Sequence, residues 1–211
     1  METSWKTVTG NLYKSVLIQT WCKIAASITT FISILSLLNI VHTDNISNVI
    51  VLNIWDILTI VANIGLICGL LIFFLNLKKW KALVAEKDAK AIGDISSATA
   101  LNMFTVIAIY IPLLSDMASI LNFIIFIILL ISYIRLKNSA TLPAGTKRGA
   151  SKIFTAMILD LVGTIIYAIT LIGIFDGLLI LVGIFTYLIL SIIALFMILS
   201  GWKCIANSEQ A

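Results

Sequence analysis

Charged residues are scarce in this chain of 211 residues: Asp, Glu, Lys and Arg together make up only 11% of it. A soluble domain carries about 25% charged residues, so this chain has too few to cover the surface of a soluble core. The same scarcity excludes a disordered chain, which needs high charge and low hydropathy to stay unfolded. A net charge of +4 is also too small to indicate nucleic-acid binding.

Cysteine and histidine are too few and too dispersed for a disulfide framework or a metal site. The chain has three cysteines (Cys22, Cys68 and Cys204) and one histidine (His42), with no spacing typical of metal ligands. It also lacks the short motifs of metalloproteases, serine hydrolases and nucleotide-binding proteins. We therefore expect no cofactor and no enzymatic activity.

The chain is instead rich in long apolar runs. Hydrophobic residues make up 61% of the chain, and its mean hydropathy is +1.12. Six segments approach the ~20 residues that cross a bilayer, at roughly 18–41, 52–77, 97–114, 117–135, 153–175 and 177–200. We predict an all-α membrane protein, residues 1–211, in which six transmembrane helices form a single bundle of three helical hairpins.

Two of the predicted joins are very short. The third and fourth segments meet at Pro112–Asp116, and the fifth and sixth meet at Gly173–Gly177. Such short joins predict hairpins. For 97–135, where the spans are shortest, a re-entrant pair is the alternative to a full crossing. The first segment is long enough to span and lacks a cleavage pattern, so we expect it to remain as a signal anchor.

Basic residues fall on one side of this six-helix arrangement. The side that carries the termini has all the Lys and Arg outside the spans: Lys6, Lys14, Lys78, Lys79, Lys81, Lys87, Lys90, Arg135, Lys137, Lys147, Arg148, Lys152 and Lys203. By the positive-inside rule that side is cytoplasmic, so both termini are predicted to be cytoplasmic. We expect the basic loops to meet anionic lipid headgroups of the plasma (inner) membrane of a prokaryote.

Three local predictions concern the aromatic and polar residues near this side. Trp80 and Trp202, each followed by Lys, and Trp21 near Lys23 are predicted to anchor helix ends at headgroup depth. The stretch 79–91 is predicted to form a short interfacial helix. The stretch 138–149, with its proline and small residues, is predicted to be a flexible loop.

Aspartates recur on the opposite side. Asp56, Asp116 and Asp176 are 60 residues apart, and with Asp44 they form an outer acidic rim that would concentrate cations. Hairpin repeats at 1–85, 86–142 and 143–211 would explain this spacing, while coincidence is the alternative, because the other matches are mostly Leu, Ile and Ala. The three-hairpin layout resembles that of mitochondrial carriers, but their Pro-x-Asp/Glu-x-x-Lys/Arg signature is absent.

Polar residues also recur at helical spacing inside the spans. The first span carries one stripe and the fifth another: Gln19, Lys23, Ser27, Thr30 and Ser33, then Asp160, Thr164, Tyr167 and Thr170. These stripes are expected to face the bundle interior, since lipid cannot satisfy them. They fit a solute pathway or simple hydrogen bonds between helices.

Asp160 is the most costly of these residues, because an aspartate in mid-bilayer costs roughly 2.5–3.5 kcal/mol. Either it pairs with Lys23, or it stays neutral and bonds to a neighbouring hydroxyl. We take Asp160, Lys23, Thr164 and Tyr167 as a candidate intramembrane polar site.

Gly65 and Gly69 form a small-xxx-small motif that lets another backbone approach, within the chain or between protomers. Two functions fit the whole sequence: permeation or transport of an ion or small solute, or a non-catalytic scaffold, regulatory or accessory subunit. In either case we expect a homo-oligomer or a partner in a membrane complex.

Overall fold

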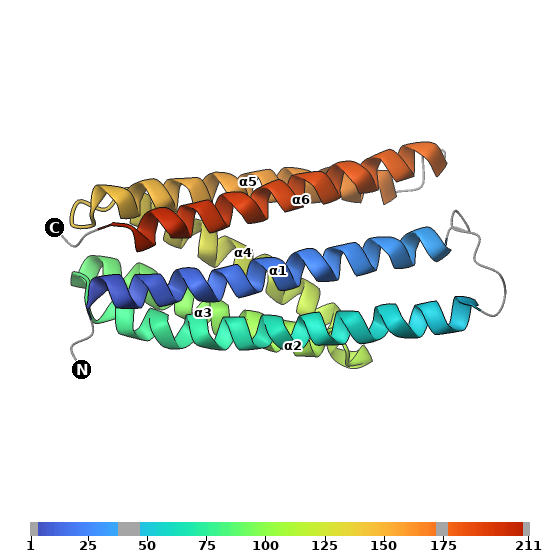
Figure 1. Ribbon diagram of the computed structural model, residues 1–211. Helices are drawn as coiled ribbons and strands as arrows, with labels where there is room; N and C mark the ends of the chain where they lie inside the picture. Colours follow the sequence, from blue (N-terminus) through green and yellow to red (C-terminus); the bar gives the residue numbers. More distant parts are fainter. Residues whose placement is uncertain (1–3, 38–46, 172–176, 209–211) are drawn as a thin grey trace.

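The computed structural model describes residues 4–37, 47–171 and 177–208, and within these ranges every regular element is an α-helix. In chain order the helices are α1 (Trp5–Leu37), α2 (Ser47–Lys81), α3 (Glu86–Ala108), α4 (Pro112–Lys137), α5 (Ala144–Leu171) and α6 (Gly177–Ala206). Figure 1 shows them as long, roughly parallel rods. The prediction of an all-helical chain is confirmed.

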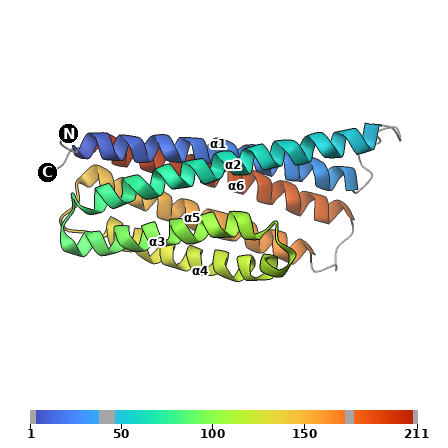
Figure 2. The ribbon, with the colours of Figure 1, turned by 90° about the horizontal axis from the view of Figure 1, so that it is seen from below.

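The helices close into a ring. Each described helix packs on its neighbours in the chain, and α6 returns to pack on α1. The closest pairs are α1–α2, α3–α4 and α5–α6, which are the predicted hairpins. Both termini lie at one end of the bundle, here called the terminal end, together with the connections 82–85 and 138–143. The 109–111 turn points toward the other end, the far end (Figure 2).

Five of the described helical stretches are long and apolar enough to cross a membrane. They are Ile57–Lys81, Glu86–Ala108, Met117–Lys137, Ala144–Thr170 and Leu179–Ala206. The described part of α1 is not among them, because Lys6, Lys14 and Lys23 and several hydroxyl residues lower its hydropathy. These helices are compatible with the predicted integral membrane protein.

Two local predictions at the terminal end are wrong. Residues 79–91 do not form a separate helix, since α2 continues to Lys81 and α3 begins at Glu86. Residues 138–149 are not all loop, because α5 already begins at Ala144, directly after Pro143. Asp88 explains why this connection is ordered: its buried carboxylate accepts hydrogen bonds from the hydroxyls of Ser139 (2.9 Å) and Thr141.

The turn between α3 and α4 lies earlier than predicted. It occupies 109–111, and Pro112 is in the first turn of α4. Proline suits this position because its missing N–H has no partner in the first turn of a helix. Asp116 therefore lies in a helix and not in the turn. The Tyr110 hydroxyl at this turn accepts a hydrogen bond from Asn63, near the middle of α2, so the α1–α2 hairpin extends beyond the turn (Figure 2).

Large aromatic side chains fill the core of the terminal end. Trp5, Phe73, Trp80, Tyr133 and Trp202 are buried together, and Trp80 and Trp202 are 0% and 1% exposed. Trp202 lies edge-on to Phe73 at 5.0 Å and to Trp80 at 5.8 Å. The prediction that Trp80 and Trp202 anchor the helix ends at headgroup depth is wrong, because both rings face the bundle interior.

Large apolar side chains are exposed beyond this core. They run from 57 to 75 on α2, 117 to 131 on α4, 158 to 169 on α5 and 179 to 196 on α6. The stretch on α2 spans roughly 27 Å at 1.5 Å per residue, close to the ~30 Å of bilayer hydrocarbon. Within 76–103, 132–157 and 197–208 no large hydrophobic side chain is exposed. The exposed belt therefore has the height and the apolar character of a surface suited to lipid.

Glycines set the closest helix contacts. A Cβ at Gly65 would lie 2.7 Å from the Cys22 Sγ, and one at Gly69 would lie 2.9 Å from Gln19. This predicted motif thus packs α2 on α1 within the chain. A second small-xxx-small motif, Gly145 and Gly149, was not recognised from the sequence. It lies against α6, where a Cβ at Gly149 would come within 2.6 Å of Ile205.

Candidate solute path

A small cavity lies inside the ring, and all six helices contribute to its wall. Its volume is ≈ 120 Å³. The apolar part of the wall comes from the terminal-end core, including Phe73 and Trp202. The polar part comes from three helices: Gln19, Lys23, Thr99, Asn102 and Tyr133. We call this space the inner cavity.

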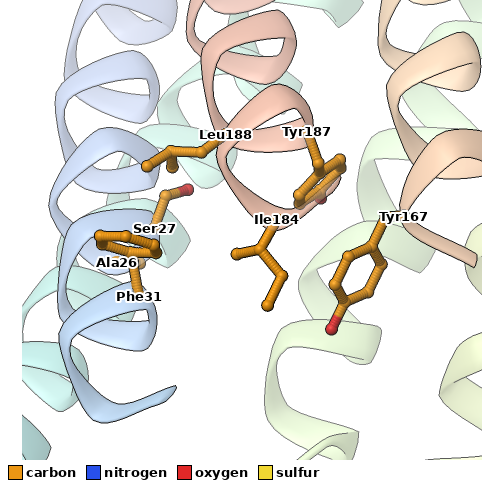
Figure 3. A pocket seen from close by; sticks show the side chains of 7 residues that line it. All are labelled: Ala26, Ser27, Phe31, Tyr167, Ile184, Tyr187 and Leu188. Atoms are coloured by element: carbon orange, nitrogen blue, oxygen red, sulfur yellow. The ribbon is translucent and has the colours of Figure 1, made fainter. Parts of the chain in front are cut away.

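The predicted stripe on α1 faces this interior. Gln19 and Lys23 line the inner cavity, and Ser27, one turn further along α1, lines a second pocket of ≈ 340 Å³. Figure 3 shows this outer pocket, where Ser27 and Phe31 of α1 lie across from Ile184 of α6 and Tyr167 of α5. The two spaces thus follow each other along one face of α1.

Asp160 lies between these levels and is held by a hydroxyl group. The Ser191 Oγ donates a hydrogen bond of 2.8 Å to the Asp160 Oδ1. Lys23 is within electrostatic range of this carboxylate. The two side chains do not form an ion pair. Among the described residues, the ion pair with an N–O distance within 4 Å is Arg135–Asp94, at 2.9 Å. Of the two arrangements considered for Asp160, the structure therefore shows the bond to a neighbouring hydroxyl and not the ion pair with Lys23.

Of the other candidate site residues, Tyr167 lines the outer pocket and Thr164 does not. Tyr167 lines the outer pocket and stacks on Tyr187, with ring centroids 5.1 Å apart. Thr164 is exposed, and its hydroxyl donates to the Asp160 backbone carbonyl at 2.9 Å. A threonine on a lipid-facing surface is satisfied in this way by its own helix.

The predicted acidic rim lies largely outside the described residues. Asp44 and Asp176 belong to the ranges 38–46 and 172–176, which are not described. Asp56 and Asp116 lie on α2 and α4, and their side chains are also outside the description. The rim therefore stays a prediction.

The aromatic core closes the inner cavity at the terminal end. Trp202, Tyr133 and Phe73 form the wall of the inner cavity on this side, and Trp5 and Trp80 pack behind them. The ring itself is fastened at this level, where the Trp5 indole N–H donates to the Ser208 carbonyl at 2.9 Å. The Thr146 and Ser208 hydroxyls are also hydrogen-bonded, at 2.8 Å.

A basic cleft lies on the outside of the terminal end. Lys87, Lys90 and Arg135 line it with Glu86, over a volume of ≈ 420 Å³. Lys87, Lys90 and Arg135 outnumber Glu86 in this cleft, and Arg135 is also paired with Asp94 at 2.9 Å.

Sequence reasoning missed Thr99, Asn102 and Ser191. Thr99 and Asn102 are three residues apart and therefore share a face of α3. This spacing, in a helix of low hydropathy, is the signal that could have identified them. Ser191 carries no such pattern, since it lies alone in a run of Leu and Ile. Only the packing of α6 on α5 brings it to Asp160.

These features support an all-helical membrane protein with several polar side chains in its interior. Among the described residues, no group of three His, Cys, Asp or Glu side chains could hold a metal ion. No protein-family model, curated protein or solved structure matches the chain.

Proposed function

We propose that this protein is a non-enzymatic membrane protein that lets an ion or small solute cross the bilayer. The observation that carries the proposal is Lys23, a charged side chain that lines a cavity walled by all six helices. A charge inside a membrane bundle is costly and is a functional-site hypothesis by default. The outer pocket on the same face of α1 supports a continuous path toward the far end.

The topology we propose has six crossings and cytoplasmic termini. Support comes from the basic residues, which gather with both termini and with the connections 82–85 and 138–143 at the terminal end. The basic cleft at Lys87, Lys90 and Arg135 fits the anionic headgroups of a cytoplasmic leaflet. On this basis we propose the plasma membrane of a prokaryote as the location.

Cysteine labelling tests the topology. In intact cells, a Lys147→Cys variant is expected to resist a membrane-impermeant thiol reagent, whereas permeabilised cells should be labelled. Labelling of Lys147→Cys in intact cells would overturn the orientation. Tyr110→Cys tests the α3–α4 pair: a full crossing exposes it to the reagent from outside, and a re-entrant hairpin protects it.

Flux through purified protein in proteoliposomes tests the function. Thr99→Leu adds carbon atoms to the inner cavity, and we expect it to block the flux that the wild-type protein shows. Ser97→Leu is the matched control, because Ser97 lies exposed on the same helix. Absence of flux for every salt tried with the wild-type protein would contradict the proposal.

A scaffold or accessory subunit is the second candidate. Gly65 and Gly69 pack within the chain, so this motif does not supply a protomer interface. We still propose a homo-oligomer or a membrane partner, because the chain offers little outside the bundle. A protein that is monomeric in nanodiscs by light scattering, and from which no partner co-purifies, would refute this part.

A further inference from the structure

The inner cavity is lined by one basic side chain and by no acidic one. Lys23 is the basic residue, and no carboxylate is among the described lining residues. Asp160 lies outside this wall, with one oxygen hydrogen-bonded to Ser191. Its carboxylate is within electrostatic range of Lys23 but is not among the groups that line the cavity.

Two neutral donors line the same cavity. The Asn102 carbonyl oxygen accepts a contact from the Thr105 hydroxyl at 3.4 Å, and the Asn102 amide nitrogen has no partner among the described residues. The Tyr133 hydroxyl lies beside the Trp202 indole and donates to no acceptor among the described residues. This arrangement leaves the Tyr133 proton able to donate.

The other two polar groups in the wall already donate hydrogen bonds within the protein. The Gln19 amide donates to the Gly69 carbonyl at 3.2 Å, and the Thr99 hydroxyl donates to the Ile95 carbonyl at 2.7 Å. The chemistry on offer is therefore one ammonium group, one amide N–H₂ and one phenolic O–H. Such a set complements negative charge.

We infer that the inner cavity binds a small monovalent anion of a few heavy atoms, such as chloride, nitrate or formate, on Lys23, Asn102 and Tyr133. A volume of ≈ 120 Å³ holds such an anion with little water, given the about 30 Å³ that a water molecule takes in the liquid. The inference rests on the proposed function and deepens it, because it assigns the solute class to this site. It also reverses the expectation of cations drawn from the acidic rim.

Chloride NMR line broadening measures the binding directly, without any flux. With the wild-type protein in phosphatidylcholine nanodiscs we expect excess broadening, which nitrate and formate reduce by competition. Gluconate is too large for the cavity and is expected to leave the broadening unchanged at equal ionic strength. Absence of broadening by the wild-type protein, or equal competition by gluconate, would overturn the inference.

Substitutions locate the site. Lys23→Met is expected to abolish the excess broadening, whereas Lys152→Met should retain it, since Lys152 lies on α5 and donates to Ser200 away from the cavity. Tyr133→Phe keeps the ring and removes one donor, so we expect about tenfold weaker binding in a protein that still folds. Wild-type broadening in Tyr133→Phe and Lys23→Met alike would place chloride elsewhere and refute the site.

Flux in proteoliposomes separates this inference from the proposed function. Chloride binding at Lys23 without flux of any ion would leave the anion site standing and refute the permeation function. Sodium or potassium flux without chloride binding would support the permeation function and refute the anion site. Chloride flux that is lost in Lys23→Met and kept in Lys152→Met supports both.

Discussion

The terminal and far parts of the bundle differ in how they pack their large aromatic side chains. At the terminal end Trp5, Trp80 and Trp202 are buried almost completely, whereas Trp21, further along α1, is 58% exposed and touches Phe196 edge-on. Water drives large apolar side chains into a core. Lipid tails are as apolar as leucine, so in the bilayer close backbone approach and polar contacts hold the helices together instead.

Trp5, Trp80 and Trp202 all lie outside the apolar segments that hydropathy predicts. The helices extend beyond the predicted apolar segments at the terminal end, for example from residue 18 back to Trp5 on α1. In these extensions the large apolar residues point inward and the lysines point outward. The comparison teaches that one bundle continues from a lipid-facing part into a part that packs as a water-facing domain does.

The largest effect is expected from a large aromatic residue in the terminal-end core. Trp202→Ala should destabilise the protein by about 3–5 kcal/mol, because it leaves a cavity beside Phe73 and Trp80. Phe196→Ala is the control on the same helix; it is 46% exposed and should cost less than about 1 kcal/mol. Unfolding in bicelles measures both, and equal losses would contradict the comparison.

The second effect concerns glycine. Gly149→Val should cost about 1–3 kcal/mol, because a side chain there meets Ile205 and the Gly201 backbone. Gly10 has nothing within 4 Å, so Gly10→Ala should stabilise α1 by about 0.5–1 kcal/mol. Thermal unfolding in nanodiscs measures both changes in stability, a loss for Gly149→Val and a gain for Gly10→Ala. A harmless Gly149→Val would mean that α5 and α6 are not in close contact at this point.

Two aspartates on α3 give a third contrast. Asp88→Ala removes the buried acceptor of the Ser139 and Thr141 hydroxyls and should cost about 1–3 kcal/mol. Asp94→Ala breaks an ion pair whose side chains are 48% and 39% exposed and should cost about 0–1 kcal/mol. Denaturant titration, with Ser139→Ala as a partial version of the first change, checks the order. A larger loss of stability from Asp94→Ala than from Asp88→Ala would contradict this order.

Asp160→Asn is expected to change stability least. The amide keeps a hydrogen-bonding oxygen for Ser191, so expression and thermal stability should stay near wild type. Flux in proteoliposomes should be lost, because the charge that balances Lys23 is gone. If Asp160→Leu leaves both stability and flux unchanged, then Asp160 has no special role in the spans.

Exchange of the two charges sharpens this last test. If the electrostatic coupling of Lys23 and Asp160 stabilises the fold, each single change to the opposite charge should destabilise, and the double exchange should recover part of the loss. A double-mutant cycle measures the coupling, which is about 0.5–3 kcal/mol for neighbouring residues. Strictly additive effects would show that the two groups do not interact.

The sequence by itself determined the helical membrane class, the hairpin pairs and the inward direction of Gln19, Lys23 and Ser27. These features follow from hydropathy and from the 3.6-residue period of a helix, which are local properties of the chain. The basic residues predicted that both termini share one side, and the structure places both termini at the same end.

Only the tertiary structure decided which surfaces meet. Closure of α6 on α1 creates the inner cavity, and its wall needs residues that are distant in sequence, such as Lys23, Asn102 and Tyr133. Packing also turned Trp80 and Trp202 inward, joined Ser191 to Asp160 and used Gly65 and Gly69 within the chain. The physical reason is that a helical pattern defines a face, while its partner is set by the shape and polarity of the other five helices.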